Sequence, residues 1–158
     1  MRIEPPKKGP DPRRYAPLLW VLLALFCLRV AGQVLVAFFG VSFLPPMAEW
    51  QSGLLPYTVL LAAQVLIVAL LARVCLDFSR GRGLFVQPNH RFARFALALG
   101  QIYFLSMVVR YVVRMGLHPE ARWLGGTIPI VFHCILASFV MLFGHFHRAQ
   151  GSVSADGA

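Results

Sequence analysis

Six polar side chains whose chemistry suits ligand binding lie inside long apolar stretches of the sequence. An arginine binds a carboxylate or a phosphate, a glutamine both donates and accepts hydrogen bonds, and tyrosine and histidine add further donors and acceptors. Two interpretations remain open, because polar residues at matching depth form either a ligand-facing site or hydrogen bonds that hold transmembrane helices together. The six residues expected to line one polar interior are Gln33, Tyr57, Gln64, Tyr103, Arg110 and His133.

Two further polar residues are expected to make intramembrane contacts, Arg29 and Gln101. An arginine at the centre of a transmembrane helix costs about 2.5–3.5 kcal/mol on insertion scales, so Arg29 should face the bundle interior or another protein. Gln33 follows four residues later and shares its helix face. Gln101 and Arg110 lie nine residues apart and point to opposite sides of one helix. One of these two is therefore expected to face a partner protein, a second copy of the chain or a lipid headgroup.

Four apolar stretches must position these side chains. The chain has 158 residues, of which 58% are hydrophobic and 13% charged, whereas soluble domains carry about 25% charged residues. Each stretch reaches about 20 residues, enough to cross the roughly 30 Å hydrocarbon core of a bilayer as a helix. We therefore predict an all-α polytopic membrane protein, with a four-helix transmembrane bundle over residues 17–148. The helices are expected at about residues 17–40, 54–76, 92–115 and 123–146.

Basic residues are distributed unevenly between the two ends of these helices. The net charge is +9, and several arginines and lysines lie in residues 1–16, which we expect to be a flexible tail. The connection after the first helix contains no Lys or Arg. The positive-inside rule therefore places both termini in the cytoplasm. Because topology explains this charge, we expect membrane lipids as partners and no nucleic acid. Residues 149–158 are expected to form a second flexible tail.

The charged residues of the connections suggest two kinds of contact. On the cytoplasmic side, arginines between the second and third helices offer a docking surface for a cytoplasmic partner or an anionic lipid. This inner-loop set comprises Arg80, Arg82, Arg91 and Arg94. On the outer side, Glu49 and Glu120 are the acidic residues expected to pair with Arg110.

The four expected helices contain no catalytic set. They include no Asp or Glu to carry a proton in coupled export, and no Ser, His and Asp arrangement. His133 and His147 lie fourteen residues apart, but a haem also needs histidines on a facing helix. We therefore predict no cofactor and no metal, with haem only if another chain supplies ligands. Whether the protein is an enzyme stays uncertain, and a non-catalytic role is favoured.

Two short motifs resemble known bacterial membrane proteins. The stretch "GRGLFVQPNHRFAR" resembles the inner loop of an uncharacterised four-helix family, with matches at Gly81 or Gly83, Phe85, Asn89, Arg91 and Arg94. The stretch "LRVAGQVLVAFFG" is similar to DoxX-like proteins, with matches at Arg29 and Gly40. The resemblance implies a small bacterial inner-membrane protein, and it implies no particular reaction.

Two functions follow from these observations as hypotheses. The first is a non-catalytic subunit or assembly factor that binds another membrane protein, or a second copy of itself, through a helix face. The alternative is a stand-alone bundle that binds a small molecule, a lipid or a quinone through a polar site in its outer half.

Overall fold

The computed structural model describes residues 9–50, 56–87, 90–117 and 127–155, and this part of the chain is helical. Its long helices are α1 (Ala16–Phe39), α2 (Tyr57–Arg80), α3 (His90–Leu117) and α4 (Thr127–Ala155). Short 3-10 helices precede or connect them: η1 (Pro12–Arg14), η2 (Met47–Glu49) and η3 (Leu84–Val86). Within the described residues, four helices are long and apolar enough to cross a membrane, which confirms the predicted all-α class and indicates an integral membrane protein.

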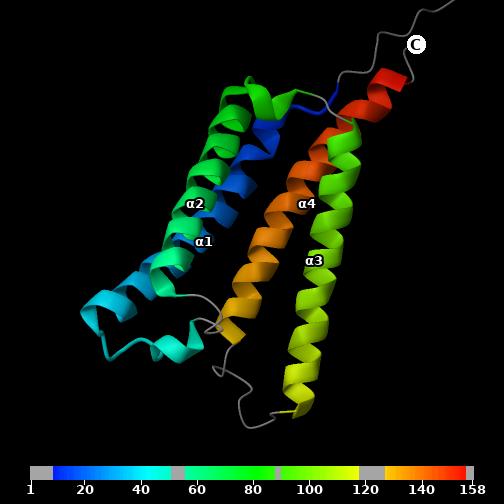
Figure 1. The fold of residues 1–158 in the computed structure, drawn as a ribbon. Coiled ribbons are helices and arrows are strands. Elements are labelled where there is room, and N and C mark those ends of the chain that lie inside the picture. Colours follow the sequence, from blue (N-terminus) through cyan, green and yellow to red (C-terminus); the bar gives the residue numbers. More distant parts are fainter. Residues whose placement is uncertain (1–8, 51–55, 88–89, 118–126, 156–158) are drawn as a thin grey trace, which may run out of the picture.

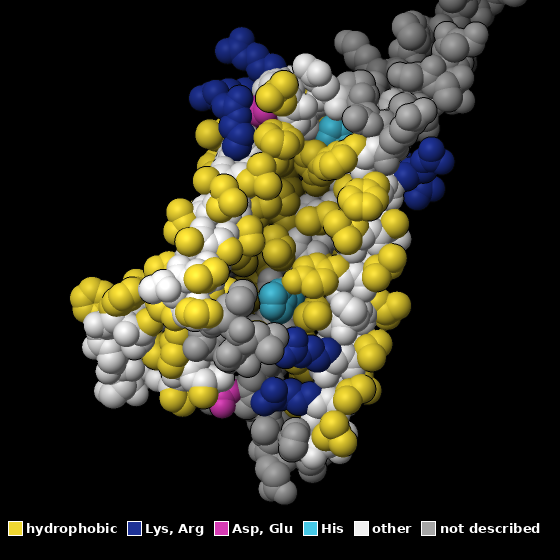
Figure 2. All heavy atoms as spheres, in the orientation of Figure 1, with side chains coloured by type: hydrophobic (Ala, Val, Ile, Leu, Met, Phe, Trp, Pro, Cys, Tyr) yellow, Lys and Arg dark blue, Asp and Glu magenta, His cyan; other side chains and the backbone are white. Residues whose placement is uncertain are grey.

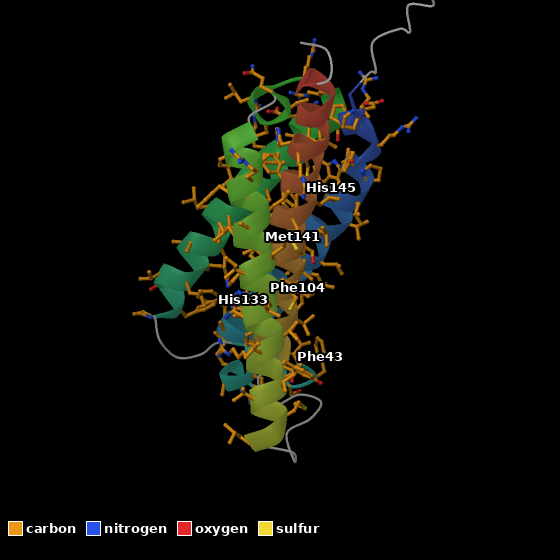
Figure 3. All side chains as sticks on the ribbon, turned by 90° about the vertical axis from the view of Figure 1, so that its right-hand side faces the viewer. Phe43, Phe104, His133, Met141 and His145 are labelled. Atoms are coloured by element: carbon orange, nitrogen blue, oxygen red, sulfur yellow. The ribbon has the colours of Figure 1, made fainter. Side chains whose placement is uncertain are left out.

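The helices stack in three layers, with α4 in the middle. The α1 and α2 helices pack against each other, α4 packs on α1, and α3 packs along α4. Figures 1 and 3 show α3 on the side of α4 that faces away from α1 and α2. We call the end where α1 begins and α4 ends the Asp77 end, and the opposite end the Trp50 end. The long axis of α1 leans away from α3 toward the Trp50 end (Figure 1).

Aromatic side chains close the bundle at the Asp77 end. Phe78 on α2 and Phe146 on α4 are fully buried, and their ring centroids lie 4.7 Å apart. Tyr15, just before α1, packs edge-on against Phe146 at 5.2 Å. In water, burying a side chain of this size contributes about 1.5–3 kcal/mol to folding stability. This cluster therefore holds the layer of α1 and α2 against α4, where the helix ends meet solvent.

Much of the remaining helix surface is apolar and exposed. Leu28 on α1, Leu66 on α2 and Ile102 on α3 are 67%, 71% and 68% exposed. Figure 2 shows hydrophobic side chains over most of the visible helix surface, with arginines gathered toward the two ends. A continuous apolar surface of this size is costly in water. A lipid environment removes that cost, in keeping with the four apolar helices.

Glycines end two of the helices. Gly40 follows α1 with φ +57°, and Gly81 follows α2 with φ +66°. The Gly81 amide donates to the Phe78 carbonyl at 3.1 Å, and the Arg82 amide donates to the Asp77 carbonyl at 3.2 Å. Glycine adopts this left-handed conformation without a Cβ penalty, so both helices stop at sharply defined turns.

Two segments expected to be flexible tails include described structure, and their flexibility stays a prediction. The α4 helix continues to Ala155, past residue 149, where the second tail was expected to begin. In the N-terminal tail, the Asp11 side chain caps η1 through the Arg13 amide at 3.0 Å. The Arg13 guanidinium donates to the Arg80 carbonyl at 3.4 Å, which ties residues 11–14 to the end of α2.

Candidate functional site

A chain of buried polar side chains joins α1 to α2 in the half of the bundle near the Trp50 end. The Arg29 Nη1 group donates to Gln33 Oε1 at 3.1 Å, and Gln64 Nε2 donates to the same oxygen at 2.9 Å. The exposed fractions of Arg29, Gln33 and Gln64 are 7%, 0% and 3%. One amide oxygen thus accepts from both helices and fixes their relative register at this depth.

The connection after α1 folds back to complete this cluster. The backbone carbonyl of Trp50 accepts a hydrogen bond from Arg29 Nη2 at 3.0 Å. The Trp50 indole is buried, donates to the Pro45 carbonyl at 2.9 Å and lies over Gly32. A Cβ at Gly32 would stand 2.6 Å from Trp50 Cη2, so the indole needs the glycine to approach α1 so closely. The sequence alone gave no sign of this contact.

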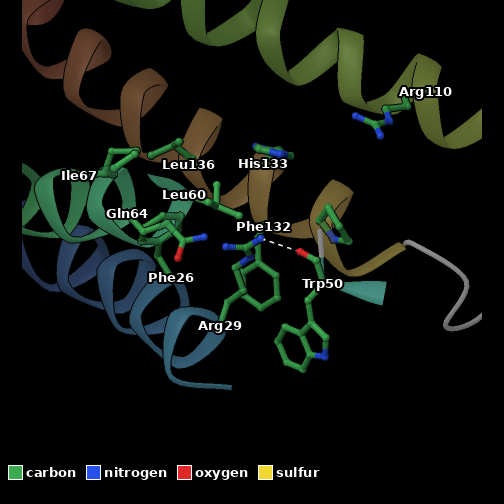
Figure 4. Close-up of a pocket in the computed structure, with 12 residues that line it drawn as sticks. Phe26, Arg29, Trp50, Leu60, Gln64, Ile67, Arg110, Phe132, His133 and Leu136 are labelled. Atoms are coloured by element: carbon green, nitrogen blue, oxygen red, sulfur yellow. Dashed lines mark hydrogen bonds between the residues drawn. The ribbon is translucent and has the colours of Figure 1, made fainter. Parts of the chain in front are cut away.

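A cavity of about 150 Å³ opens beside Arg29. Figure 4 shows the side chains around it, with His133 between Arg29 and Arg110 in that view. All four helices and the Trp50 segment contribute to its walls. The described lining residues are Phe26, Arg29, Trp50, Leu60, Ala63, Gln64, Ile67, Arg110, Pro129, Phe132, His133 and Leu136.

The cavity carries positive charge without acidic compensation among its described lining residues, none of which is Asp or Glu. The buried Nε of Arg29 has no hydrogen-bond partner in the described structure, and the same holds for Gln64 Oε1. An unpaired buried donor costs about 1–3 kcal/mol, and a charged one more. An anion in the cavity would satisfy Arg29 and stand opposite the second arginine, Arg110.

A further polar contact, between Tyr103 and His133, joins α3 to α4. The Tyr103 hydroxyl and His133 Nδ1 are 2.6 Å apart, and the two rings meet edge-on with centroids at 5.8 Å. This bond turns the imidazole toward the cavity and leaves Nε2 as the second ring nitrogen for a ligand. In the described parts of the chain, no three His, Cys, Asp or Glu side chains are grouped so that they could hold a metal ion.

The structure brings some of the predicted site residues together and separates others. Four of them line the cavity: Arg29, Gln64, Arg110 and His133. Gln33 and Tyr103 do not line it, but they hydrogen-bond the lining residues Arg29 and His133. Tyr57 does not line it; its ring packs on Phe38 at 5.8 Å, and its buried hydroxyl has no partner among the described residues. Whether the cavity binds a ligand stays a prediction.

Gln101 faces a different part of the molecule. It lies in an open groove that α1 and α3 form over α4, together with Ser138 and His145. Figure 3 shows His145 on α4, several turns from His133. Gln101 and Arg110 therefore lie in separate sites, as their nine-residue spacing requires. Of the two predicted acidic partners, Glu49 lies in η2 and Glu120 lies outside the described residues.

A buried acidic residue, Asp77, holds the tight turn that follows α2, and the sequence analysis did not single it out. The α2 helix continues to Arg80, past the expected end at residue 76, so Asp77 lies within it. Asp77 is 1% exposed, accepts from the Phe85 amide at 3.3 Å and pairs with Arg73 at 3.3 Å. The four-residue spacing of Arg73 and Asp77 was the signal that could have extended the helix.

Gly83 and His147 complete this turn. Gly83 has φ +135°, and a Cβ there would overlap the Asp77 carboxylate. His147 Nε2 and the Phe85 carbonyl are 2.9 Å apart, which joins η3 to α4. These contacts give the loop after α2 a fixed shape.

The arginines predicted to form an inner-loop docking surface lie around this turn. Arg80, Arg82 and Arg94 are exposed, and the side chain of Arg91 lies outside the described residues. Exposed guanidinium groups at a helix end attract anionic lipid headgroups by about 1 kcal/mol each. Whether this surface binds a partner stays a prediction.

The comparisons give no relative for this chain: no protein-family model, no curated protein and no solved structure matches it. The functional conclusion therefore depends on the geometry of the cavity.

Proposed function

We propose that the protein is a membrane protein that binds an anionic small molecule or lipid headgroup in the cavity between Arg29 and Arg110. The observation that carries this proposal is the buried guanidinium of Arg29. It donates only to neutral acceptors, Gln33 and the Trp50 carbonyl, and no acidic residue is among the described lining residues. A purely structural arginine is more stable with a carboxylate partner.

The other polar groups fit the same role. Arg110 on α3 brings a second cation to the cavity, and His133 presents a ring nitrogen there, held by Tyr103. Guanidinium groups bind carboxylates and phosphates with paired hydrogen bonds, which gives both affinity and orientation. A site of this kind retains, senses or passes on an acid, and it needs no catalytic residue.

A direct test identifies acids that travel with the protein. The protein is purified in mild detergent, denatured, and its released small acids are quantified by mass spectrometry. We expect a stoichiometric acid with the wild type and its loss with Arg110→Gln. Arg114→Gln is the matched control, because Arg114 lies one turn away on α3 and is not a described lining residue. Equal amounts in all three preparations would contradict the proposal.

A second candidate function is a non-catalytic subunit of a larger membrane complex. Its specific support is Gln101, an exposed amide that lies in an open groove near the middle of α3. A hydrogen bond from another helix would satisfy it, at about 0.6 kcal/mol on average in membranes. Mild-detergent purification from the native membrane, followed by identification of co-purifying proteins, tests this. A stoichiometric partner that is lost with Gln101→Leu supports a subunit.

We further propose that both termini are cytoplasmic and that the membrane is a bacterial inner membrane. The uneven distribution of Lys and Arg supports the orientation. The Asp77 end, with its exposed Arg80, Arg82 and Arg94, would then meet the cytoplasm.

A further inference from the structure

An apolar groove runs along the bundle beside the polar cavity. It lies between α2 and α3 over α4 and has a volume of about 220 Å³. Every described residue that lines it is Leu, Val, Ala or Phe: Leu70, Leu71, Val74, Phe85, Phe92, Phe95, Ala96, Leu99, Phe139, Val140 and Phe143. In Figure 2 this region is a band of hydrophobic side chains between α2 and α3, with a histidine and arginines at its lower end.

The groove and the cavity lie end to end along two helices. On α4, Leu136 lines the cavity and Val140, one turn further, lines the groove. On α2, Ile67 and Leu71 have the same relationship. One turn of helix is about 5.4 Å, so the lining residues of the two spaces are neighbours on both helices.

The combined space has a polar part and an apolar part. Its charged groups lie toward the Trp50 end, and the apolar lining extends toward the Asp77 end. From His133 to Phe143 on α4, the distance along the helix is about 15 Å at about 1.5 Å per residue. Leu70 and Leu99 on the two walls are 52% and 50% exposed, so the groove is open along its length to surrounding lipid. A chain could enter from the side.

We infer that the ligand is a long-chain fatty acid, with its carboxylate between Arg29 and Arg110 and its acyl chain in the groove. The inference rests on the proposed function, and it specifies the ligand further: an acyl tail and a headgroup as small as a carboxylate. A cavity of about 150 Å³ is small beside the roughly 300–1,000 Å³ of common ligand sites. It suits a carboxylate rather than a glycerophosphate with two chains, and its positive charge favours an anion over a neutral ester.

The test uses palmitate that carries a photoreactive diazirine near its methyl end. The purified full chain is reconstituted in zwitterionic lipid, irradiated, and the labelled residues are mapped by mass spectrometry. We expect labels on the groove segments of α2, α3 and α4. Excess palmitate should abolish them, whereas octanoate and methyl palmitate should compete poorly.

Two sets of variants link the head to the tail. Arg110→Gln should remove the groove labels although the diazirine lies far from this residue, and Arg114→Gln should keep them. Leu99→Trp and Leu70→Trp narrow the groove from opposite walls and should reduce labelling to the background seen with excess palmitate. Ile102→Trp, on an exposed part of α3 that does not line the groove, is the control. Size-exclusion profiles check that each variant is folded.

The outcomes separate the inference from the function beneath it. Labels that depend on Arg110 but map outside the groove would overturn the placement of the tail and leave the anion site standing. If methyl palmitate competes as well as palmitate, the cavity does not require a carboxylate headgroup. If lysophosphatidylglycerol competes more strongly than palmitate, the headgroup is a phosphate and not a carboxylate. Labels spread over all lipid-facing residues, unchanged in Arg110→Gln, would overturn the fatty acid as the ligand. The proposed anion site would then be decided separately, by whether Arg110→Gln loses a stoichiometric acid that the wild type retains.

Discussion

Gln33 on α1 and Gln64 on α2 share a hydrogen bond of 2.9 Å in the buried centre of the bundle. The accepting Gln33 oxygen also receives the Arg29 guanidinium, so the two helices and the cavity wall depend on one atom. The hydrogen bonds show a structural role for this cluster, and the proposed binding role falls on the same residues. Helix–helix contact and ligand binding are therefore compatible interpretations of these side chains.

Replacing Gln33 should destabilise the bundle. Gln33→Leu removes the shared acceptor and leaves donors on Arg29 and Gln64 without a partner, at about 1–3 kcal/mol for each unsatisfied group. We expect a fall of at least about 2 kcal/mol in the free energy of unfolding, measured by denaturant titration in detergent. Gln101→Leu is the control, because that exposed amide has no hydrogen bond within the described structure. An equal loss in both variants would contradict the special role of Gln33.

Gly32 should tolerate no larger residue. In a helix interior, Gly→Ala normally stabilises by about 0.5–1 kcal/mol. At Gly32 the added Cβ would stand 2.6 Å from the Trp50 indole and push it outward. We therefore expect Gly32→Ala to destabilise the protein and to shift the tryptophan fluorescence. Gly116→Ala, a helical position with nothing within 4 Å, should be neutral or stabilising. A stabilised Gly32→Ala would show that the indole does not pack there.

Gly83 should be essential to the turn at the Asp77 end. Gly83→Ala combines a φ of +135° with an overlap on the Asp77 carboxylate, and backbone strain of this kind costs about 1–3 kcal/mol before the overlap is counted. Gly40→Ala is the comparison variant, because Gly40 combines a milder left-handed φ of +57° with nothing within 4 Å. In thermal unfolding, the melting temperature of Gly83→Ala should be well below that of Gly40→Ala. Similar melting temperatures for the two would exclude a steric role for Asp77.

The C-terminus should lie in the cytoplasm and the Trp50 end of α3 on the other side of the membrane. Fusion of green fluorescent protein after residue 158 should give fluorescent cells, because this reporter folds in the cytoplasm. Fusion of alkaline phosphatase after Gly116, at the Trp50 end of α3, should give active enzyme, which requires export. The reverse pattern would overturn the proposed orientation. Fluorescence after residue 158 together with inactive phosphatase after Gly116 would contradict a spanning α4, the helix that lies between the two fusion points.

The sequence predicted the helices because hydrophobic length is a strong signal. It also predicted that Gln33 and Gln64 lie at similar depth, since both stand well inside their apolar stretches. Helix ends were less predictable. The α2 boundary was placed before Asp77 on the basis of charge, although a charged residue in the last turn is stable when it pairs with a residue four positions earlier.

Two features of the site could not be predicted from the sequence: the contact of the Trp50 segment with Arg29, and the position of Tyr57 away from the cavity. The Trp50 segment reaches Arg29 through a backbone carbonyl, and every residue has a carbonyl, so the type of residue 50 could not reveal the contact. The separation of Tyr57 from the cavity has a similar origin. Tyr57 begins α2, and its ring packs on Phe38 of α1 instead of lining the cavity. Tertiary packing, which periodicity does not encode, decided both.

The most direct test of the anion site is an experimental structure of the protein extracted from its native membrane, at a resolution that separates bound ligands from water. We predict density between the guanidinium groups of Arg29 and Arg110, beside His133, that continues as an apolar chain toward Phe139. A cavity that holds water alone, or in which an acidic side chain of the protein itself pairs with Arg29, would contradict the proposed function.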